Sequence, residues 1–130
     1  CLINMEIINS DEDTVSEYLT VCNQTGNNNV YFHELLGNLY REHKFGTILQ
    51  GAESLIRVAN VRLIELLLHC VRNIFIIHKF HFINLASKYY NELSSLPIGD
   101  NEIVWNHPLQ IYKHKLVARY YKIIYLFSSL

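Results

Sequence analysis

Two pairs of side chains have the spacing that catalysis or metal binding requires. Glu65 and His69 are four residues apart, so on a helix a carboxylate would lie beside an imidazole, an arrangement that can transfer protons. His78 and His81 are three apart and could bind a metal ion on one helical face. However, no third ligand follows at a recognisable spacing, and the alternating charges around Glu65 are more typical of a solvated helix face. We therefore expect no enzyme activity, no metal and no cofactor.

Other sequence signals of an active site are missing as well. The chain has no glycine-rich phosphate loop, no HExxH sequence and no serine or cysteine in a nucleophile motif. Its three cysteines, Cys1, Cys22 and Cys70, lack CxxC spacing, which argues against both a disulfide framework and a zinc site. We therefore expect an intracellular protein, cytoplasmic or nuclear. Because the sequence begins with Cys1 and not with Met, we also expect it to be a piece of a larger protein.

The composition is that of a folded domain. Half of the 130 residues are apolar and 18% are charged, which excludes a disordered polar chain and provides enough apolar side chains for a core. Charged and histidine side chains interrupt the apolar run 63–83, so we expect no membrane span. The charge is uneven: residues 1–60 contain eight acidic and three basic side chains, and residues 61–130 contain four acidic and eight basic ones. No acidic residue follows Glu102, so the end of the chain is basic.

The spacing of the apolar residues predicts an all-α domain. Apolar side chains recur three and four apart in six segments: 11–22, 30–43, 47–59, 61–79, 82–93 and 108–127. We expect a domain of about five main helices in antiparallel pairs. We predict a helix stop at Phe45-Gly46, a cap at Thr47 and a left-handed helix end at Asn60. Pro108 suits the first turn of the last helix.

A single domain can be divided into three parts on this basis. Residues 1–29 provide an N-terminal helix and a polar loop, residues 30–97 two helix pairs, and residues 98–130 a loop and a basic C-terminal helix. Segment 61–79 is predicted to be the central helix. One polar stripe of this helix is expected to face solvent. The rest of its surface, which includes Ile77, is expected to face the core. The stripe consists of Arg62, Glu65, His69, Arg72, Asn73 and Lys79.

A recurrence in the middle of the chain suggests a helical repeat. The tripeptide His-Lys-Phe at 43–45 returns at 78–80, which is 35 positions later, and we interpret each copy as a turn between helices with its Phe packed inward. Together with Leu36, Gly37 and Tyr40, and with the small residues Gly51 and Ala52, residues 31–97 resemble the tetratricopeptide repeat. The resemblance implies paired helices and a scaffold that binds other proteins. An unrelated helical bundle with the same local pattern is the alternative.

The basic side chains provide the predicted contact surface. Lys115, Arg119 and Lys122 project to one face of the last helix, opposite its apolar stripe, while Arg62 and Arg72 lie on the polar stripe of the central helix. We predict that these five residues bind a partner. The predicted function is that of a non-enzymatic interaction or scaffold domain that binds a peptide, a helix or an acidic surface of another protein. Homodimerisation through the apolar ends of the chain is a further option.

Two alternative functions stay open. The basic last helix could contact phosphates in a nucleic-acid-associated domain, with weak and salt-sensitive affinity. A small helical bundle could also act as a viral-type decoy that captures an amphipathic helix of a host protein. No signature sequence supports the decoy, and nothing in the chain suggests that it reads bases.

Overall fold

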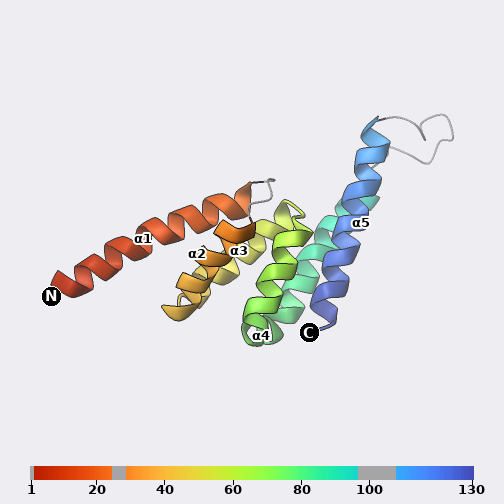
Figure 1. Cartoon of the computed structure of the whole chain (residues 1–130). Coiled ribbons are helices and arrows are strands. Elements are labelled where there is room, and N and C mark those ends of the chain that lie inside the picture. The colour runs from red at the N-terminus through yellow and green to blue at the C-terminus, as the bar shows by residue number, and fades with distance from the viewer. Residues whose placement is uncertain (1, 25–28, 97–107) are drawn as a thin grey trace.

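The computed structural model describes residues 2–24, 29–96 and 108–130, and all regular structure within these ranges is helical. Five helices follow one another: α1 (Leu2–Asn23), α2 (Asn29–Arg41), α3 (Phe45–Arg57), α4 (Val61–Ser94) and α5 (Pro108–Ser128). They pack as a bundle in which α1, α2 and α3 contact one another, α2 and α3 contact α4, and α5 lies along α4 (Figure 1). The predicted all-α class is confirmed, and the described part of the last helix begins at Pro108.

The first three helices meet at Tyr18. Its ring stacks on Phe32 of α2, with 5.5 Å between ring centroids, and its hydroxyl donates a hydrogen bond to the carbonyl of Ile48 in α3 at 3.3 Å. The ring lies directly over Gly51, where a β-carbon would be 2.6 Å from the Tyr18 hydroxyl oxygen. The small residue predicted in this helix therefore makes room for α1. Burial raises the pKa of Tyr18 well above its usual value, so the hydroxyl remains a donor.

Two helix ends are followed by left-handed residues, whereas the sequence predicted one, at Asn60. After the end of α2, His43 has φ 58°, and the amide of Lys44 donates to the carbonyl of Leu39 at 2.9 Å. α3 ends in the same way: Ala59 has φ 53°, and the amide of Asn60 donates to the carbonyl of Leu55. This six-to-one hydrogen bond satisfies carbonyls that the end of a helix leaves free.

Four predictions about helix ends were wrong. Gly46 and Thr47 lie inside α3, which begins at Phe45 with Lys44 as its cap, so they neither stop nor cap a helix. Asn60 is not the left-handed residue, because that position belongs to Ala59 and Asn60 caps the next helix. α1 begins at Leu2 and not at Asp11. Of the two predicted polar loops, residues 25–28 and 97–101 lie outside the described residues.

The predicted segments 61–79 and 82–93 form one helix. The first His-Lys-Phe copy lies at the turn between α2 and α3, with its Phe45 packed against the core, as predicted. The second copy lies inside α4 and is not a turn, and its Phe80 is 72% exposed, so the interpretation was wrong for this copy. The irregularity lies at Val71, whose dihedral angles (φ −132°, ψ 36°) are not helical. In Figure 1 the ribbon of α4 bends, so that the part next to α3 and the part beside α5 take different directions. None of the described helices is long and apolar enough to cross a bilayer.

The irregularity at Val71 also explains an error in the predicted core face. Before Val71 the exposed residues are Arg62, Glu65 and His69, as the polar stripe predicts. A non-helical residue rotates the following turns relative to the preceding ones, so one helical projection cannot describe both parts. Ile77, predicted to be inside, is 79% exposed. Lys79, predicted on the polar stripe, is half-buried, and its ammonium group lies 3.4 Å from the carbonyl oxygen of Leu130.

Aromatic packing fixes α5 along the second part of α4. Phe75, Phe82 and Phe127 are fully buried, and their ring centroids are 5.1 to 6.0 Å apart. Further along, Tyr89 stacks on Tyr120 with 5.6 Å between centroids. The order of these pairs shows that α5 runs antiparallel to this part of α4. Such buried rings contribute much of the apolar surface of a small core.

The contact between Tyr18 and Gly51 gives the first prediction. We expect Gly51→Ala to lower the free energy of unfolding by about 1–3 kcal/mol, because the added methyl group would displace the buried Tyr18 ring. Gly37→Ala is the matched control: a β-carbon there meets nothing within 4 Å, so the better helix propensity of alanine should stabilise α2 by about 0.5–1 kcal/mol. Urea unfolding followed by circular dichroism measures both changes. Equal effects of the two substitutions would contradict the close approach of α1 to α3.

Candidate basic cleft at the α3–α4 turn

The turn between α3 and α4 is held by its own hydrogen bonds. The left-handed Ala59 reverses the chain, and the side-chain oxygen of Asn60 then accepts a hydrogen bond from the amide of Leu63 at 3.2 Å. This cap begins α4 at Val61 and places Arg62 in its first turn. The first turn of α4 contains no acidic residue, although the positive end of a helix dipole favours one.

Tyr120 places α5 beside this turn. Its hydroxyl donates a hydrogen bond of 3.0 Å to the carbonyl of Arg57, the last residue of α3. Burial raises the pKa of Tyr120 above its usual value of 10.0, and Tyr89 adds to the shift. The hydroxyl therefore stays neutral and able to donate at physiological pH. The basic face of α5 is thereby fixed next to the end of α3 and the start of α4.

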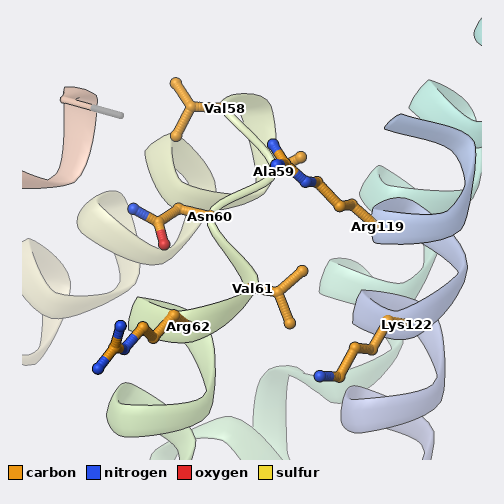
Figure 2. Close-up of a pocket in the computed structure, with 7 residues that line it drawn as sticks. All are labelled: Val58, Ala59, Asn60, Val61, Arg62, Arg119 and Lys122. Atoms are coloured by element: carbon orange, nitrogen blue, oxygen red, sulfur yellow. The ribbon is translucent and has the colours of Figure 1, made fainter. Parts of the chain in front are cut away.

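A cleft of about 380 Å³ lies between the turn and α5. Figure 2 shows that Arg119 and Lys122 extend from α5 toward the turn, whereas the guanidinium group of Arg62 points away from Lys122. Three of the five predicted contact residues therefore line one cleft. Arg119 and Lys122 direct their charged groups toward it, whereas Arg62 lines it without doing so. The lining residues are Val58, Ala59, Asn60, Val61, Arg62, Arg119 and Lys122.

Glu65 partly neutralises the cleft. Its carboxylate lies 2.8 Å from the ammonium group of Lys122 and so joins α4 to α5. Both side chains are about half exposed, which limits the contribution of this ion pair to the free energy of unfolding. Arg119 has no ion pair or hydrogen bond with any residue that the structure describes. Of the three basic side chains that line the cleft, Arg62 and Lys122 do have such described partners, Asn29 and Glu65.

A second hollow, of about 260 Å³, lies on the other side of Arg62. With its amide oxygen turned toward α4, Asn29 accepts hydrogen bonds from Nε and a terminal nitrogen of Arg62 at 2.7 and 2.9 Å. Glu65 and His69 both line this hollow, as the proton-transfer hypothesis requires. The carboxylate of Glu65 is bound by Lys122, and no hydrogen bond joins it to His69 in the described part of the chain. The arrangement fits a solvated helix face better than an acid–base pair.

The other predicted residues are not gathered at the cleft. Arg72 and Lys115 are exposed, and neither lines the cleft. Of the proposed histidine pair, Nε2 of His81 lies 2.8 Å from a carboxylate oxygen of Glu53. Within the described ranges, no three histidine, cysteine or acidic side chains are placed so that they could hold a metal ion.

The two described cysteines are unsuited to nucleophilic chemistry. Cys22 is buried beside Tyr18, and this burial raises the pKa of its thiol to about 12. Burial also raises the pKa of Cys70, which is half-buried. Both thiols therefore stay protonated at neutral pH, and a protonated thiol is a poor nucleophile.

Sequence reasoning missed the residues of the turn that form one wall of the cleft. Val58 and Ala59 carry no charged or polar side chain, and alanine seldom adopts a left-handed conformation, so neither residue gave a signal. The basic spacing on α5 was the only available signal, and it identified Arg119 and Lys122. Comparison with known proteins adds nothing to the assignment, since no protein family model, curated protein or solved structure matches this chain.

The hydrogen bond of Tyr120 gives the second prediction. We expect Tyr120→Phe to lower the free energy of unfolding by about 1 kcal/mol, since it removes the donor to the Arg57 carbonyl and keeps the ring. Tyr121→Phe serves as the control, because Tyr121 is 64% exposed and follows Tyr120 directly. The raised pKa of Tyr120 makes this contribution complete below pH 10.0 and lost as the pH rises through the higher pKa. Urea titrations of the three proteins at neutral and alkaline pH would measure it, and a larger effect of Tyr121→Phe would refute the assignment.

Proposed function

We propose that the chain is a non-enzymatic interaction domain that binds an acidic segment of another protein in the cleft at the α3–α4 turn. The observation that carries the proposal is the convergence of Arg119 and Lys122 on the first turn of α4, where Arg62 already lies. These residues come from two helices that the fold holds together.

The electrostatics of the cleft favour an anionic ligand. The start of α4 bears a partial positive charge from the helix dipole, and Arg62 adds a full positive charge where an acidic residue would be stabilising. Arg119 and Lys122 approach the same turn from α5. Glu65 is the carboxylate that offsets them, through Lys122. A carboxylate from a partner would relieve the remaining repulsion, and arginine is well suited to bind it with two parallel hydrogen bonds.

The dimensions of the cleft favour a peptide over a nucleic-acid duplex. A volume of about 380 Å³ accommodates one or two side chains of a partner. Binding to a duplex requires a row of cations along successive phosphates, and Arg72 and Lys115 do not extend the cleft in this way. An acidic peptide or surface loop is therefore the preferred ligand, and a nucleic acid is the second candidate.

Two finer features belong to the same proposal. We regard α2 and α3 as a divergent tetratricopeptide-like pair, because both helices have 13 residues and a short turn joins them. We also place the interaction inside the cell, where the buried Cys22 and half-buried Cys70 would remain thiols.

Charge reversal in the cleft gives the third prediction. We expect the double substitution Arg119→Glu and Lys122→Glu to weaken binding of a fluorescein-labelled peptide of alternating Glu and Ala at least about tenfold, since two attractions become repulsions. Fluorescence anisotropy at about 0.1 M salt measures the affinity. Lys115→Glu is the matched control. It reverses a charge on the same helix outside the cleft, so we expect a loss of less than about threefold.

The same experiment separates the competing ligands. Random-sequence duplex DNA is titrated against the same proteins, and tighter binding of the duplex, lost in the double variant, would favour the nucleic-acid function. Failure of the wild-type chain to bind the acidic peptide would overturn the proposal. An equal loss from Lys115→Glu would show that the overall charge of α5 matters and the cleft does not.

The ion pair between Glu65 and Lys122 gives the fourth prediction. We expect Glu65→Gln to raise the affinity for the acidic peptide about two- to fivefold, because Lys122 loses its internal partner and becomes available to the ligand. Glu53→Gln is a control that removes a negative charge at His81, away from the lining of the cleft. An unchanged affinity of Glu65→Gln, or an equal gain from both variants, would argue that Lys122 does not contact the ligand.

A further inference from the structure

An exposed apolar surface lies on α4 after the irregularity at Val71. Ile76, Ile77 and Phe80 are 46%, 79% and 72% exposed, and we refer to these three side chains as the apolar tip. Their positions, one and three or four residues apart, place them on one side of the helix. Single exposed apolar side chains are common, but a group of large ones surrounded by polar residues marks an interaction site.

The apolar tip is surrounded by basic and neutral residues. No acidic residue occurs from position 66 to position 91, a stretch that contains Arg72, Lys79 and Lys88. Arg72 lies four residues before Ile76 and is exposed, as is Lys88. The ammonium group of Lys79 lies 5.4 Å from the centroid of the Phe80 ring. Glu53 of α3 is the acidic side chain that reaches this region, where it is bound to His81.

The apolar tip lies at one end of the bundle. Lys79 is within 3.4 Å of the carbonyl oxygen of Leu130, which places this part of α4 at the C-terminal end of α5. Figure 1 shows that end of α5 beside the bend of α4, at the lower edge of the bundle, away from the start of α4. Neither of the hollows beside Arg62 includes a residue of the apolar tip.

We propose that the apolar tip is a docking site for an anionic membrane surface. Ile76, Ile77 and Phe80 would enter the boundary between head groups and acyl chains, while the exposed Arg72 and Lys88 contact the anionic head groups. A helix that lies in a membrane interface has this combination of aromatic and aliphatic residues flanked by basic ones. The cytoplasmic leaflet carries the negative charge that these bases require.

The position at the end of the bundle favours a membrane over an acidic amphipathic peptide. A peptide helix binds with its apolar face in a groove that covers it from both sides. The hollows beside Arg62, and a third one lined by Ser16 and Tyr31 between α1 and α2, contain no residue of the apolar tip, which belongs to the outer face of one helix. A bilayer needs no groove, because it surrounds projecting side chains. The proposal does not depend on the cleft, which uses other residues.

Vesicle flotation with the full chain tests the proposal. We expect binding to vesicles of phosphatidylcholine in which about a third of the lipid is phosphatidylserine, and little binding to phosphatidylcholine alone. The double substitution Ile77→Ser and Phe80→Ser should weaken binding at least about tenfold through lost apolar burial. The double substitution Arg72→Gln and Lys88→Gln should weaken it about fivefold per base. Salt near 1 M should release the wild-type protein, because the screening length falls to about 3 Å.

Matched substitutions on α5 control for general apolar adhesion. Tyr121 and Tyr125 are 64% and 66% exposed, so Tyr121→Ser with Tyr125→Ser removes comparable apolar surface elsewhere and should leave vesicle binding unchanged. All altered side chains are exposed, and circular dichroism checks that each variant is folded. The proposal is overturned if the wild type ignores the anionic vesicles, if the Ile77/Phe80 variant binds as well as the wild type, or if the tyrosine variant loses as much. Loss of vesicle binding in the Arg119/Lys122 variant alone would assign it to the cleft instead.

Discussion

The packing of α5 against the second part of α4 is the contact on which the proposed binding surfaces depend. Phe75, Phe82 and Phe127 form its buried centre, and Tyr120 extends it to the last carbonyl of α3. The ion pair between Lys122 and Glu65 and the hydrogen bond from Lys113 to the carbonyl of Leu96 add polar contacts between α5 and α4. The aromatic rings fix both the axial position and the rotation of α5. Arg119 and Lys122 therefore line the cleft at the start of α4.

This packing brings three basic residues to one turn. The start of α4 has Arg62 where an acidic residue would interact well with the helix dipole, and Arg119 and Lys122 approach from α5. Asn29 accepts hydrogen bonds from Arg62, whose guanidinium group points away from Lys122, and Lys122 pairs with Glu65. The local side chains therefore separate and partly pair these charges, and the ligand that we propose would supply a further carboxylate.

Sequence periodicity predicted those parts of the fold that depend on a regular helix. The helix predicted at 47–59 from apolar residues three and four apart is present in α3, and Ile48, Leu55 and Ile56 on its regular turns are buried against the core. Periodicity failed after Val71, because the backbone of this residue is not helical and the following turns of α4 are rotated relative to the preceding ones. The exposure of Ile77 and Phe80 therefore could not be predicted from the spacing of apolar residues. The left-handed Ala59 was equally inaccessible, because hydrogen bonds of the completed turn impose that conformation on a residue that seldom adopts it.

The same reasoning explains why the cleft was predicted only in part. Spacing on one helix identifies side chains that share a face, and it grouped Lys115 with Arg119 and Lys122. Only packing between helices selects which part of that face meets another element, and it brings in Arg119 and Lys122 but not Lys115. The residues on the opposite wall, Val58 and Ala59, contribute shape and backbone to the cleft and no charge. A cleft made from a turn and a neighbouring helix is therefore a property of tertiary structure, and a single sequence reveals only its charged half.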